Sequence, residues 1–419
     1  MTPRLAGLSP WSAEVSTHLP HLSKRQVMGL ATYSLGMVLA QSSGLSVVVY
    51  MLSLLLGQSE NTVRQRLREV IYEAEAKRGA KRRAIEVEKC FGPLLKWIVS
   101  WWGGGEKRIA LAMDASNLGE RFTVLAISVM YRGCALPVAW AVLPEGVKGA
   151  WMPHWERLLR RLRGAIPEDW QVVVLADRGL YSKRLYRAIQ RNGWHPMMRV
   201  KQQTLFRPEG KSRFRPLNKM LERPNSIWYG RGECFKTPEA RLACTVLAHW
   251  DAGFAEPWLL VTDLEPEGAD SLWYAMRNWI EQGFKDAKRG GFRWEQTKMV
   301  HPQRVARLWL VMALATLLLL SVGGDEEHHA SPSGLADASA DEEHAASPDA
   351  SPADELPPGR ATRPRRLSVL KRGWLTLLAH LIRYGELRIG RFWPEPWPRL
   401  PFVRQFLEPF WRGGHVFLY

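Results

Sequence analysis

Four polar residues that could act on a phosphate group recur at helical spacing in one segment of the chain. Tyr274, Arg277, Glu281 and Lys288 are separated by three, four and seven residues, in a stretch without proline. Because an α-helix repeats about every 3.6 residues, this spacing predicts that the four side chains lie on one helical face. A carboxylate flanked by a phenol, a guanidinium and an ammonium group suits a divalent metal held beside phosphates. The alternative is an ordinary amphipathic helix with Arg277 and Glu281 paired in solvent.

Two aspartates upstream follow apolar runs that predict buried strands. Asp114 ends the run 108–113, and Asp177 ends the run 171–176. The order of the segments predicts β-β-β-α-β-α-β, in which the first and fourth strands can be neighbours in a mixed sheet. The two carboxylates would then lie together, where unpaired like charges are costly unless cations bind. A strand-terminal aspartate often only caps a turn, so each residue alone is weak evidence.

Together the three acids form a set that suits metal-dependent phosphodiester chemistry. Asp114, Asp177 and Glu281 could hold two divalent metals about 3.5–4 Å apart, which activate a water or a 3′-hydroxyl and stabilise the leaving oxygen. Mg²⁺ suits oxygen ligands and keeps positions open for phosphate, with Mn²⁺ as the alternative. The sequence has no His or Cys cluster that would compete for this role.

Composition indicates a polyanionic partner. The chain has 419 residues, a net charge of +17 and a pI near 9.9, which favours nucleic acid over a membrane surface. Its four cysteines form no CxxC pair, which argues against a zinc knuckle or a disulfide framework and fits a reducing cytoplasm. No signal peptide is expected. The apolar stretches 27–57 and 308–322 are interrupted or too short for a span of about 20 residues, so we expect buried helices and no membrane partner.

Shifts in composition predict four regions. They are a helical N-terminal domain at 1–104, a strand-rich core at 105–322, an acidic Ala/Ser/Pro-rich linker at 323–359, and a basic Trp-rich tail at 360–419. The linker contains ten acidic residues and no Lys or Arg, and it cannot bury enough apolar surface to fold. Short strands predict a β-rich insertion at 201–270 within the core. A helix is expected at 367–382, in a region that is otherwise a loose tail or a DNA contact.

A helical hairpin near the N-terminus is a candidate for DNA binding. An apolar helix over 46–56 ends at Gly57, and a second helix over 61–71 carries Arg64, Arg66 and Arg68. This is the outline of a helix-turn-helix, whose second helix enters the major groove of DNA. Many helical hairpins share the outline, so a packing role remains the alternative.

Three motifs resemble those of the DDE transposases of bacterial insertion sequences. They are Leu-Ala-Met-Asp-Ala-Ser at 111–116, Leu-Ala-Asp-Arg-Gly-Leu-Tyr at 175–181, and the Y-R-E-K spacing over 274–288, which is similar more narrowly to insertion sequence family four. The resemblance covers residues 108–322. It implies an α/β fold, with an RNase H-like mixed-sheet catalytic core, a β-rich insertion before the glutamate, and a helical N-terminal domain.

The resemblance also implies roles for the residues. Asp114, Asp177 and Glu281 would bind the metals, and Tyr274, Arg277 and Lys288 would grip phosphates of the transposon end. The candidates for an aromatic residue that stabilises a flipped base are Trp228, Trp258 and Trp294.

The implied activity is metal-dependent excision and strand transfer of an insertion sequence, by cut-and-paste through a hairpin intermediate. The implied partners are double-stranded DNA, as terminal inverted repeats and target, and a second copy of the chain in a homodimer. The implied location is the nucleoid in a bacterial cytoplasm. Two alternatives remain: a catalytically inactive or domesticated DNA-binding protein, and an RNase H-like metal nuclease without strand transfer.

Overall fold

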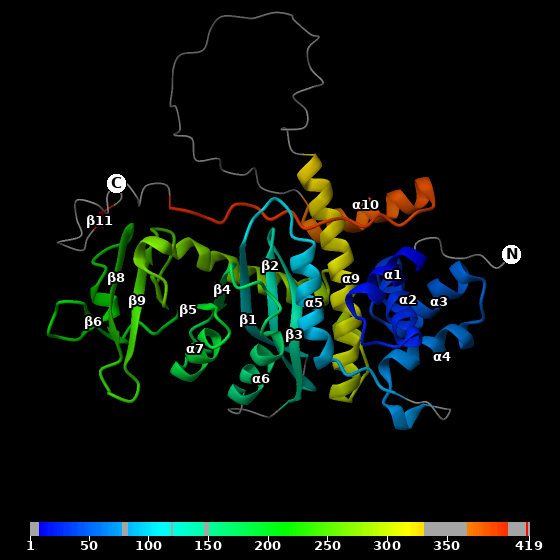
Figure 1. Ribbon diagram of the computed structural model, residues 1–419, viewed down its shortest axis with the longest axis horizontal. Helices are drawn as coiled ribbons and strands as arrows, with labels where there is room; N and C mark the ends of the chain where they lie inside the picture. The colour runs from blue at the N-terminus through cyan, green and yellow to red at the C-terminus, as the bar shows by residue number, and fades with distance from the viewer. Residues whose placement is uncertain are drawn as a thin grey trace, which may run out of the picture.

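The computed structural model describes residues 8–77, 83–118, 120–145, 151–330 and 367–400, and the backbone of residues 416–417. Within them, one mixed sheet extends through the molecule, and a long helix separates it from a group of N-terminal helices (Figure 1).

One half of the sheet, from the edge strand β3 to β5, is an RNase H-like arrangement of five strands. These strands are β1 (Arg108–Leu118), β2 (Phe122–Tyr131), β3 (Cys134–Pro144), β4 (Gln171–Ala176) and β5 (His195–Arg199). β1, β2 and β3 form an antiparallel meander, β4 pairs in parallel with β1, and β5 pairs in parallel with β4. Every residue of β2 is buried, as expected for a strand that is covered on both faces. The predicted fold class is confirmed.

Helices cover the two faces of this sheet. On one face Leu111 and Val174 belong to the same core as residues of α6 (Met152–Leu162) and α7 (Lys183–Gln190). On the other face Ala112 and Leu175 pack with residues of the 3₁₀ helix η4 (Ser271–Asn278) and of α8 (Trp279–Ala287). The alternation follows from the two-residue repeat of a strand. It places the segment with Tyr274 to Lys288 across the end of β4 and the neighbouring part of β1. The predicted end of the first strand at Asp114 is wrong: β1 continues to Leu118, with Asp114 opposite Ala126 of β2, and only its pairing with β4 stops at Met113.

The predicted β-rich insertion extends the same sheet. Its strands are β6 (Leu205–Pro208), β7 (Arg215–Pro216), β8 (Ser226–Cys234), β9 (Leu242–Trp250) and β10 (Trp258–Thr262). The strand order is β3-β2-β1-β4-β5-β10-β9-β8-β6-β7, and β11 (Val416–Phe417) pairs with β8. β10 is antiparallel to β5, with Leu260 opposite Arg199. The chain therefore returns from the insertion directly beside the central strands before it enters η4.

The N-terminal region is helical and packs around one long helix. Its helices are α1 (Leu8–His18), α2 (Lys24–Ala40), α3 (Leu45–Leu56), α4 (Glu60–Ile71) and α5 (Glu88–Ser100). Short 3₁₀ turns elsewhere are η1 (Ala74–Ala76), η2 (Leu217–Lys219), η3 (Pro266–Gly268) and η5 (Trp294–Gln296). A Cβ at Gly36 would lie 2.7 Å from Leu52, so the glycine lets α2 and α3 pack closely. Figure 1 shows α9 (Pro302–His329) between helices α1 to α4 and the sheet, with α5 on the sheet side.

In the described part of the chain, α9 is the only helix that is by itself long and apolar enough to cross a membrane. Its most apolar window has a mean hydropathy of 2.2, but 94% of that window is buried within the protein. α2 and α3 meet the same criterion only as a pair, and the pair is bent by 97°. The burial of α9 against both the helical region and β3 makes it the central core helix, in agreement with the buried helix expected at 308–322.

The C-terminal third departs from the predicted linker. Residues 323–329 continue α9 instead of starting a linker, because Arg388 binds Asp325 (3.0 Å) and Glu326 (2.6 Å) of this last helical part. Residues 331–359 of the predicted linker lie outside the described residues. The expected helix is present as α10 (Val369–Tyr384). It crosses α9 where Gly323 and Gly373 meet: a Cβ on either would lie about 2 Å from a backbone oxygen of the other helix.

Residues 385–400 form a strap across the molecule. Phe392 is fully buried and its ring packs against Tyr131 (5.1 Å between centroids). Further on, Trp397 packs against Trp273 of η4 (4.9 Å), and the amide of Leu400 donates to Asp270 just before η4 (2.8 Å). For residues 367–400 the alternative of a loose tail is therefore wrong, since these aromatic residues are used in packing.

Candidate active site

The segment with the four spaced polar residues is two helices joined end to end. The sequence predicts one α-helix, but Tyr274 and Arg277 lie in η4, and Glu281 lies in α8. Asp270 caps η4 by accepting from the amide of Leu272 (2.8 Å). A 3₁₀ helix has about three residues per turn, so residues three apart align, whereas residues four apart align in the α-helix that follows. The predicted shared face therefore survives the change of helix type.

Arg277 is the centre of the site. Its Nη2 donates to Oδ2 of Asp114 (2.7 Å) and lies 3.9 Å from Oδ2 of Asp177, while Nη1 donates to Oε1 of Glu281 (2.6 Å). The Arg277 side chain is only 12% exposed. The structure thus brings the three predicted carboxylates together around one guanidinium. The exposed Arg277–Glu281 pair of the alternative interpretation is instead part of this cluster.

Tyr274 lies on the other side of Asp177. Its hydroxyl is 3.5 Å from Oδ1 of Asp177, and its ring packs against Trp258 at the start of β10 (5.5 Å). Burial, with Asp177 nearby, raises the pKa of Tyr274 well above its ordinary value. The phenol therefore stays neutral and can donate a hydrogen bond beside the carboxylates.

Lys288 does not contact the three acids. Its side chain reaches β1 a few residues further along the strand than Asp114. Its Nζ donates to Oγ of Ser116 (2.8 Å) and to the carbonyl of Asn117 (3.0 Å). Burial lowers the pKa of Lys288, and Glu295 opposes this effect. Ser116 and Asn117 were not singled out from the sequence, although Ser116 lies in the motif that contains Asp114.

Burial and the mutual repulsion of the acids change the pKa values of the groups in the site. Burial raises the pKa of Asp114, and Asp177 and Glu281 add to this, against the lowering effect of Arg277. Burial alone would lower the pKa of Arg277, but Asp114 and its other anionic neighbours raise it above its ordinary value. A permanent cation in the centre is thus what stabilises the cluster of like charges.

The donor set fits a hard divalent cation, although Arg277 lies in its centre. Three carboxylates that converge on one positive charge are oxygen ligands of the type Mg²⁺ prefers. Among the described residues, no three His, Cys, Asp or Glu side chains are grouped closely enough to hold a metal ion. Nε of Arg277 is buried without a hydrogen-bond partner in the described structure, so this side chain is not fully satisfied where it lies. Asp114, Asp177 and Glu281 would hold a metal once the guanidinium moves.

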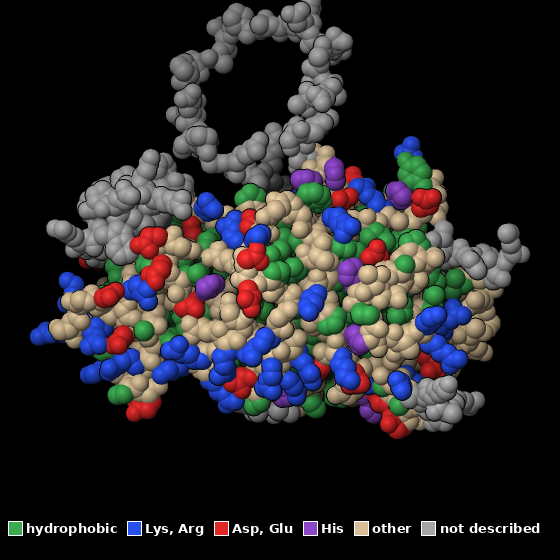
Figure 2. Space-filling view, in the orientation of Figure 1, with side chains coloured by type: hydrophobic (Ala, Val, Ile, Leu, Met, Phe, Trp, Pro, Cys, Tyr) green, Lys and Arg blue, Asp and Glu red, His purple; other side chains and the backbone are tan. Residues whose placement is uncertain are grey.

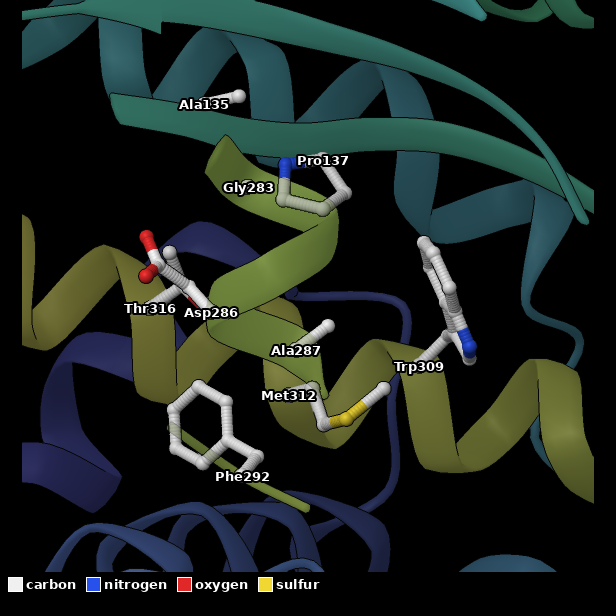
Figure 3. A pocket seen from close by; sticks show the side chains of 9 residues that line it. All are labelled: Ala135, Pro137, Gly283, Asp286, Ala287, Phe292, Trp309, Met312 and Thr316. Carbon is white, nitrogen blue, oxygen red and sulfur yellow. The ribbon is translucent and has the colours of Figure 1, made fainter. Parts of the chain in front are cut away.

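A further acid in α8 is buried and forms no ion pair among the described residues. Asp286 is 7% exposed, and Gln282 donates to its Oδ1 (2.8 Å). Burial raises the pKa of Asp286 to about 6. It borders a cavity of about 20 Å³ lined by residues of β3, α8 and α9, together with Phe292 (Figure 3). This acid was not recognised in the sequence, because a single Asp in an amphipathic helix gives no sign of burial.

The loop between β9 and β10 lies beside Asp177. Glu256 in this loop pairs with Arg178 and Arg199 (3.4 Å each). Phe254, 53% exposed, packs against Trp258 (6.0 Å). The contacts of Glu256 fix this aromatic pair next to Tyr274, and no spacing in the sequence signals the arrangement.

The other candidate residues lie away from the carboxylates. Trp228 and Trp294 are buried, and Trp294 packs against Trp309 of α9. The three arginines of the predicted helix-turn-helix lie on α4 and are partly exposed: Arg64, Arg66 and Arg68. Arg64 is bound to Glu60 (3.5 Å) and Arg68 lies over the ring of Tyr72. A role for α4 in DNA binding stays a prediction.

Comparison with known proteins gives a family match over part of the chain. Residues 119–318, which include Asp177 and Glu281 and begin just after Asp114, match the family described as transposase DDE domain. A piggyBac transposase synaptic complex with hairpin DNA, solved by cryo-electron microscopy, is similar with a TM-score of 0.36 and 13% identity. The similarity covers 73% of this chain and 69% of that chain. No curated protein matches the sequence. The family match, which extends from just before β2 into α9, supports a DDE transposase.

Proposed function

We propose that the protein is a transposase of insertion sequence family four, which excises a DNA element and joins it to a target with Mg²⁺ or Mn²⁺. The observation that carries the proposal is the contact of Arg277 with Asp114, Asp177 and Glu281. An acid within β1, an acid at the end of β4 and an acid of α8 are drawn together there, and the Y-R-E-K spacing adds phosphate-binding groups nearby. The partner would be double-stranded DNA, bound by a homodimer in the bacterial nucleoid.

The chain's own residues would hold the metals and the DNA end. Bound at Asp114, Asp177 and Glu281, divalent metals would supply an activated water or 3′-hydroxyl and stabilise the leaving oxygen. The neutral phenol of Tyr274 and the ammonium group of Lys288 flank the acids and can donate to phosphate oxygens.

Arg277 would exchange partners when DNA arrives. In the free protein its guanidinium contacts all three acids and offsets part of their negative charge. A phosphate can likewise accept two hydrogen bonds from the planar guanidinium and can also satisfy the unpartnered Nε. Movement of Arg277 onto a phosphate of the transposon end would free the carboxylates for metal. DNA binding and metal binding would therefore favour each other.

The hairpin step would use the aromatic pair beside the site. Of the three tryptophans considered from the sequence, Trp258 is the one that contacts Tyr274. Phe254, which packs on Trp258 and is exposed, provides the outer face on which an unstacked base could stack. The buried positions of Trp228 and Trp294 argue against them.

Cleavage and joining of the terminal inverted repeats that flank the gene would test the proposal. Asp177→Asn and Glu281→Gln should abolish both reactions in Mg²⁺ or Mn²⁺. The matched control is Asp169→Asn, because Asp169 lies just before the other end of β4 and is exposed and paired only with Lys107. Undiminished activity of Asp177→Asn would refute the assignment of the acids. Hydrolysis without joining would favour the metal nuclease, and metal-independent binding without cleavage would favour a DNA-binding protein.

A further inference from the structure

A second concentration of charge covers the sheet face opposite η4 and α8. Helices α6 and α7 and the residues just after them present six exposed arginines, which we call the α6–α7 surface: Arg160, Arg161, Arg163, Arg184, Arg187 and Arg191. Figure 2 shows Lys and Arg side chains gathered along the lower edge of the molecule, over α6 and α7. The chain therefore carries its positive charge unevenly, with a dense group on these two helices.

Most of this charge is not neutralised within the protein. Glu156 pairs with Arg184 (2.5 Å) and Arg191 (3.2 Å), and Glu88 of α5 pairs with Arg161 (3.1 Å). The other three arginines have no carboxylate within ion-pair distance among the described residues: Arg160, Arg163 and Arg187. An isolated basic face would be solvated, but this one also contains a formed pocket.

The pocket lies between the ends of α6 and α7. It has a volume of about 200 Å³ and is lined by Arg160, Arg163, Arg191, Asn192 and Glu156, among others. A water molecule in the liquid takes up about 30 Å³, so the pocket has room for a larger polar group. Arg163 is held in place by the carbonyl of Arg191 (2.9 Å) and the side chain of Asn192 (3.4 Å). The guanidinium groups are thus partly oriented before any ligand binds.

This pocket is remote from the three carboxylates. Arg163 follows α6 on the way to the start of β4, and Arg191 follows α7 on the way to the start of β5. Asp177 lies at the opposite end of β4. A six-residue strand rises about 20 Å, so the two sites are separated by about that distance as well as by the sheet.

We propose that the α6–α7 surface binds the phosphate backbone of a DNA duplex, with one phosphate in the pocket of Arg160, Arg163 and Arg191. Guanidinium groups bind phosphates bidentately, and an exposed surface of two helices with excess positive charge suits contacts that do not depend on base sequence. The surface would hold DNA beyond the segment at the carboxylates. Only the choice of DNA as the polyanion rests on the proposed function.

Binding of a short fluorescent duplex of random sequence to the full chain, in EDTA and over a range of salt, tests this surface. Arg160→Gln/Arg187→Gln removes two cations without breaking an ion pair. The matched control is Lys371→Gln/Arg383→Gln, which removes two exposed cations from α10. Each phosphate contact contributes about 0.9 to the slope of log affinity against log salt, so the α6–α7 variant should lower the slope by about 2 and weaken binding on the order of tenfold. The α10 variant should bind like wild type.

Three results would refute the proposal that the α6–α7 surface binds DNA. They are equal losses in both double variants, no loss in either, or no binding of random duplex by the wild type. Sedimentation with vesicles that contain phosphatidylserine is the second arm: an effect of the α6–α7 variant there, but not on DNA, would replace DNA by a membrane. Circular dichroism and thermal melting exclude misfolding. Binding is measured without metal and so does not depend on catalysis. If the wild-type protein binds DNA but does not cleave it, the proposed function is refuted, whereas the proposed DNA contact of the α6–α7 surface is not.

Discussion

The two charged regions of this protein are built in opposite ways. Around Arg277, one cation with 12% exposure is shared by three acids, so its charge is used within the protein. On the α6–α7 surface, exposed arginines outnumber their acidic partners, and their charge is left for a partner molecule. In the first region a change should alter stability and metal binding. In the second it should alter binding of a polyanion and leave stability almost unchanged.

The largest effect on stability is expected for Arg277→Gln. Removal of the guanidinium leaves Asp114, Asp177 and Glu281 with no shared cation, and breaking a buried ion pair costs about 3–5 kcal/mol. Urea unfolding in EDTA should show this loss in the free energy of unfolding. Mg²⁺ should restore stability in the variant more than it stabilises wild type, because metal takes the place of the guanidinium. If Mg²⁺ affects both proteins equally, Arg277 does not compete with metal.

Asp286→Asn should increase the free energy of unfolding at pH 7, in contrast to Arg277→Gln. The pKa of Asp286 rises from 3.8 to about 6 on folding, so the folded state binds more protons than the unfolded state between these values. Wild-type stability therefore falls as pH rises from about 4 to about 6, by about 3 kcal/mol in total.

The asparagine keeps the acceptor for Gln282 and has no charge to desolvate. The variant should be more stable than wild type at pH 7, and the difference should vanish near pH 4. Unfolding curves at these two pH values measure it. A difference that does not change with pH would show that the carboxyl is not the cause.

Gly283→Ala should disturb the first region through packing alone. A Cβ at Gly283 would lie 2.7 Å from the Cβ of Ala135, so α8 would have to move away from β3. Overpacking of this kind costs about 1–3 kcal/mol and would shift Glu281 with the helix. The rate of DNA cleavage should fall by a larger factor than the loss of folding stability alone explains. Gly253→Ala, in the β9–β10 loop with open space at the Cβ position, is the control and should change neither.

The smallest effect is expected for Arg184→Gln on the α6–α7 surface. Its pair with Glu156 is exposed, with the arginine side chain at 60%, and such pairs contribute about 0.2–1 kcal/mol. Thermal melting should be almost unchanged. A loss as large as that of Arg277→Gln would erase the distinction between the two regions.

The sequence predicts the elements of the site better than their contacts. Asp177 is recognisable because it directly follows a strand that is apolar on both faces. Asp114 is recognisable from the apolar run before it, although β1 continues through it to Leu118. The shared face of Tyr274, Arg277 and Glu281 survives because three-residue steps suit a 3₁₀ helix and four-residue steps an α-helix. The position of Arg277 between the acids depends on side-chain conformations and long-range folding, which spacing does not specify.

Long-range packing also explains the errors. The acidic end of α9 has the composition of a linker, and contacts with the distant Arg388, Arg132 and Trp393 hold it in the helix. The crossing of Gly323 and Gly373 joins segments that lie far apart in the sequence. The pocket of the α6–α7 surface likewise needs the ends of two helices, each of which is merely basic when considered alone.

The strap of residues 385–400 makes the site dependent on a segment that is encoded far downstream of its acids. Leu400 donates to the same Asp270 carboxylate that caps η4, and Trp397 packs on that helix. A premature stop codon or a frameshift upstream of this segment would leave the codons for all three acids intact. The shortened product would nevertheless lose contacts that hold the start of η4, on which Tyr274 and Arg277 depend. Intact catalytic codons are therefore insufficient evidence that a given copy of such a gene encodes a working site.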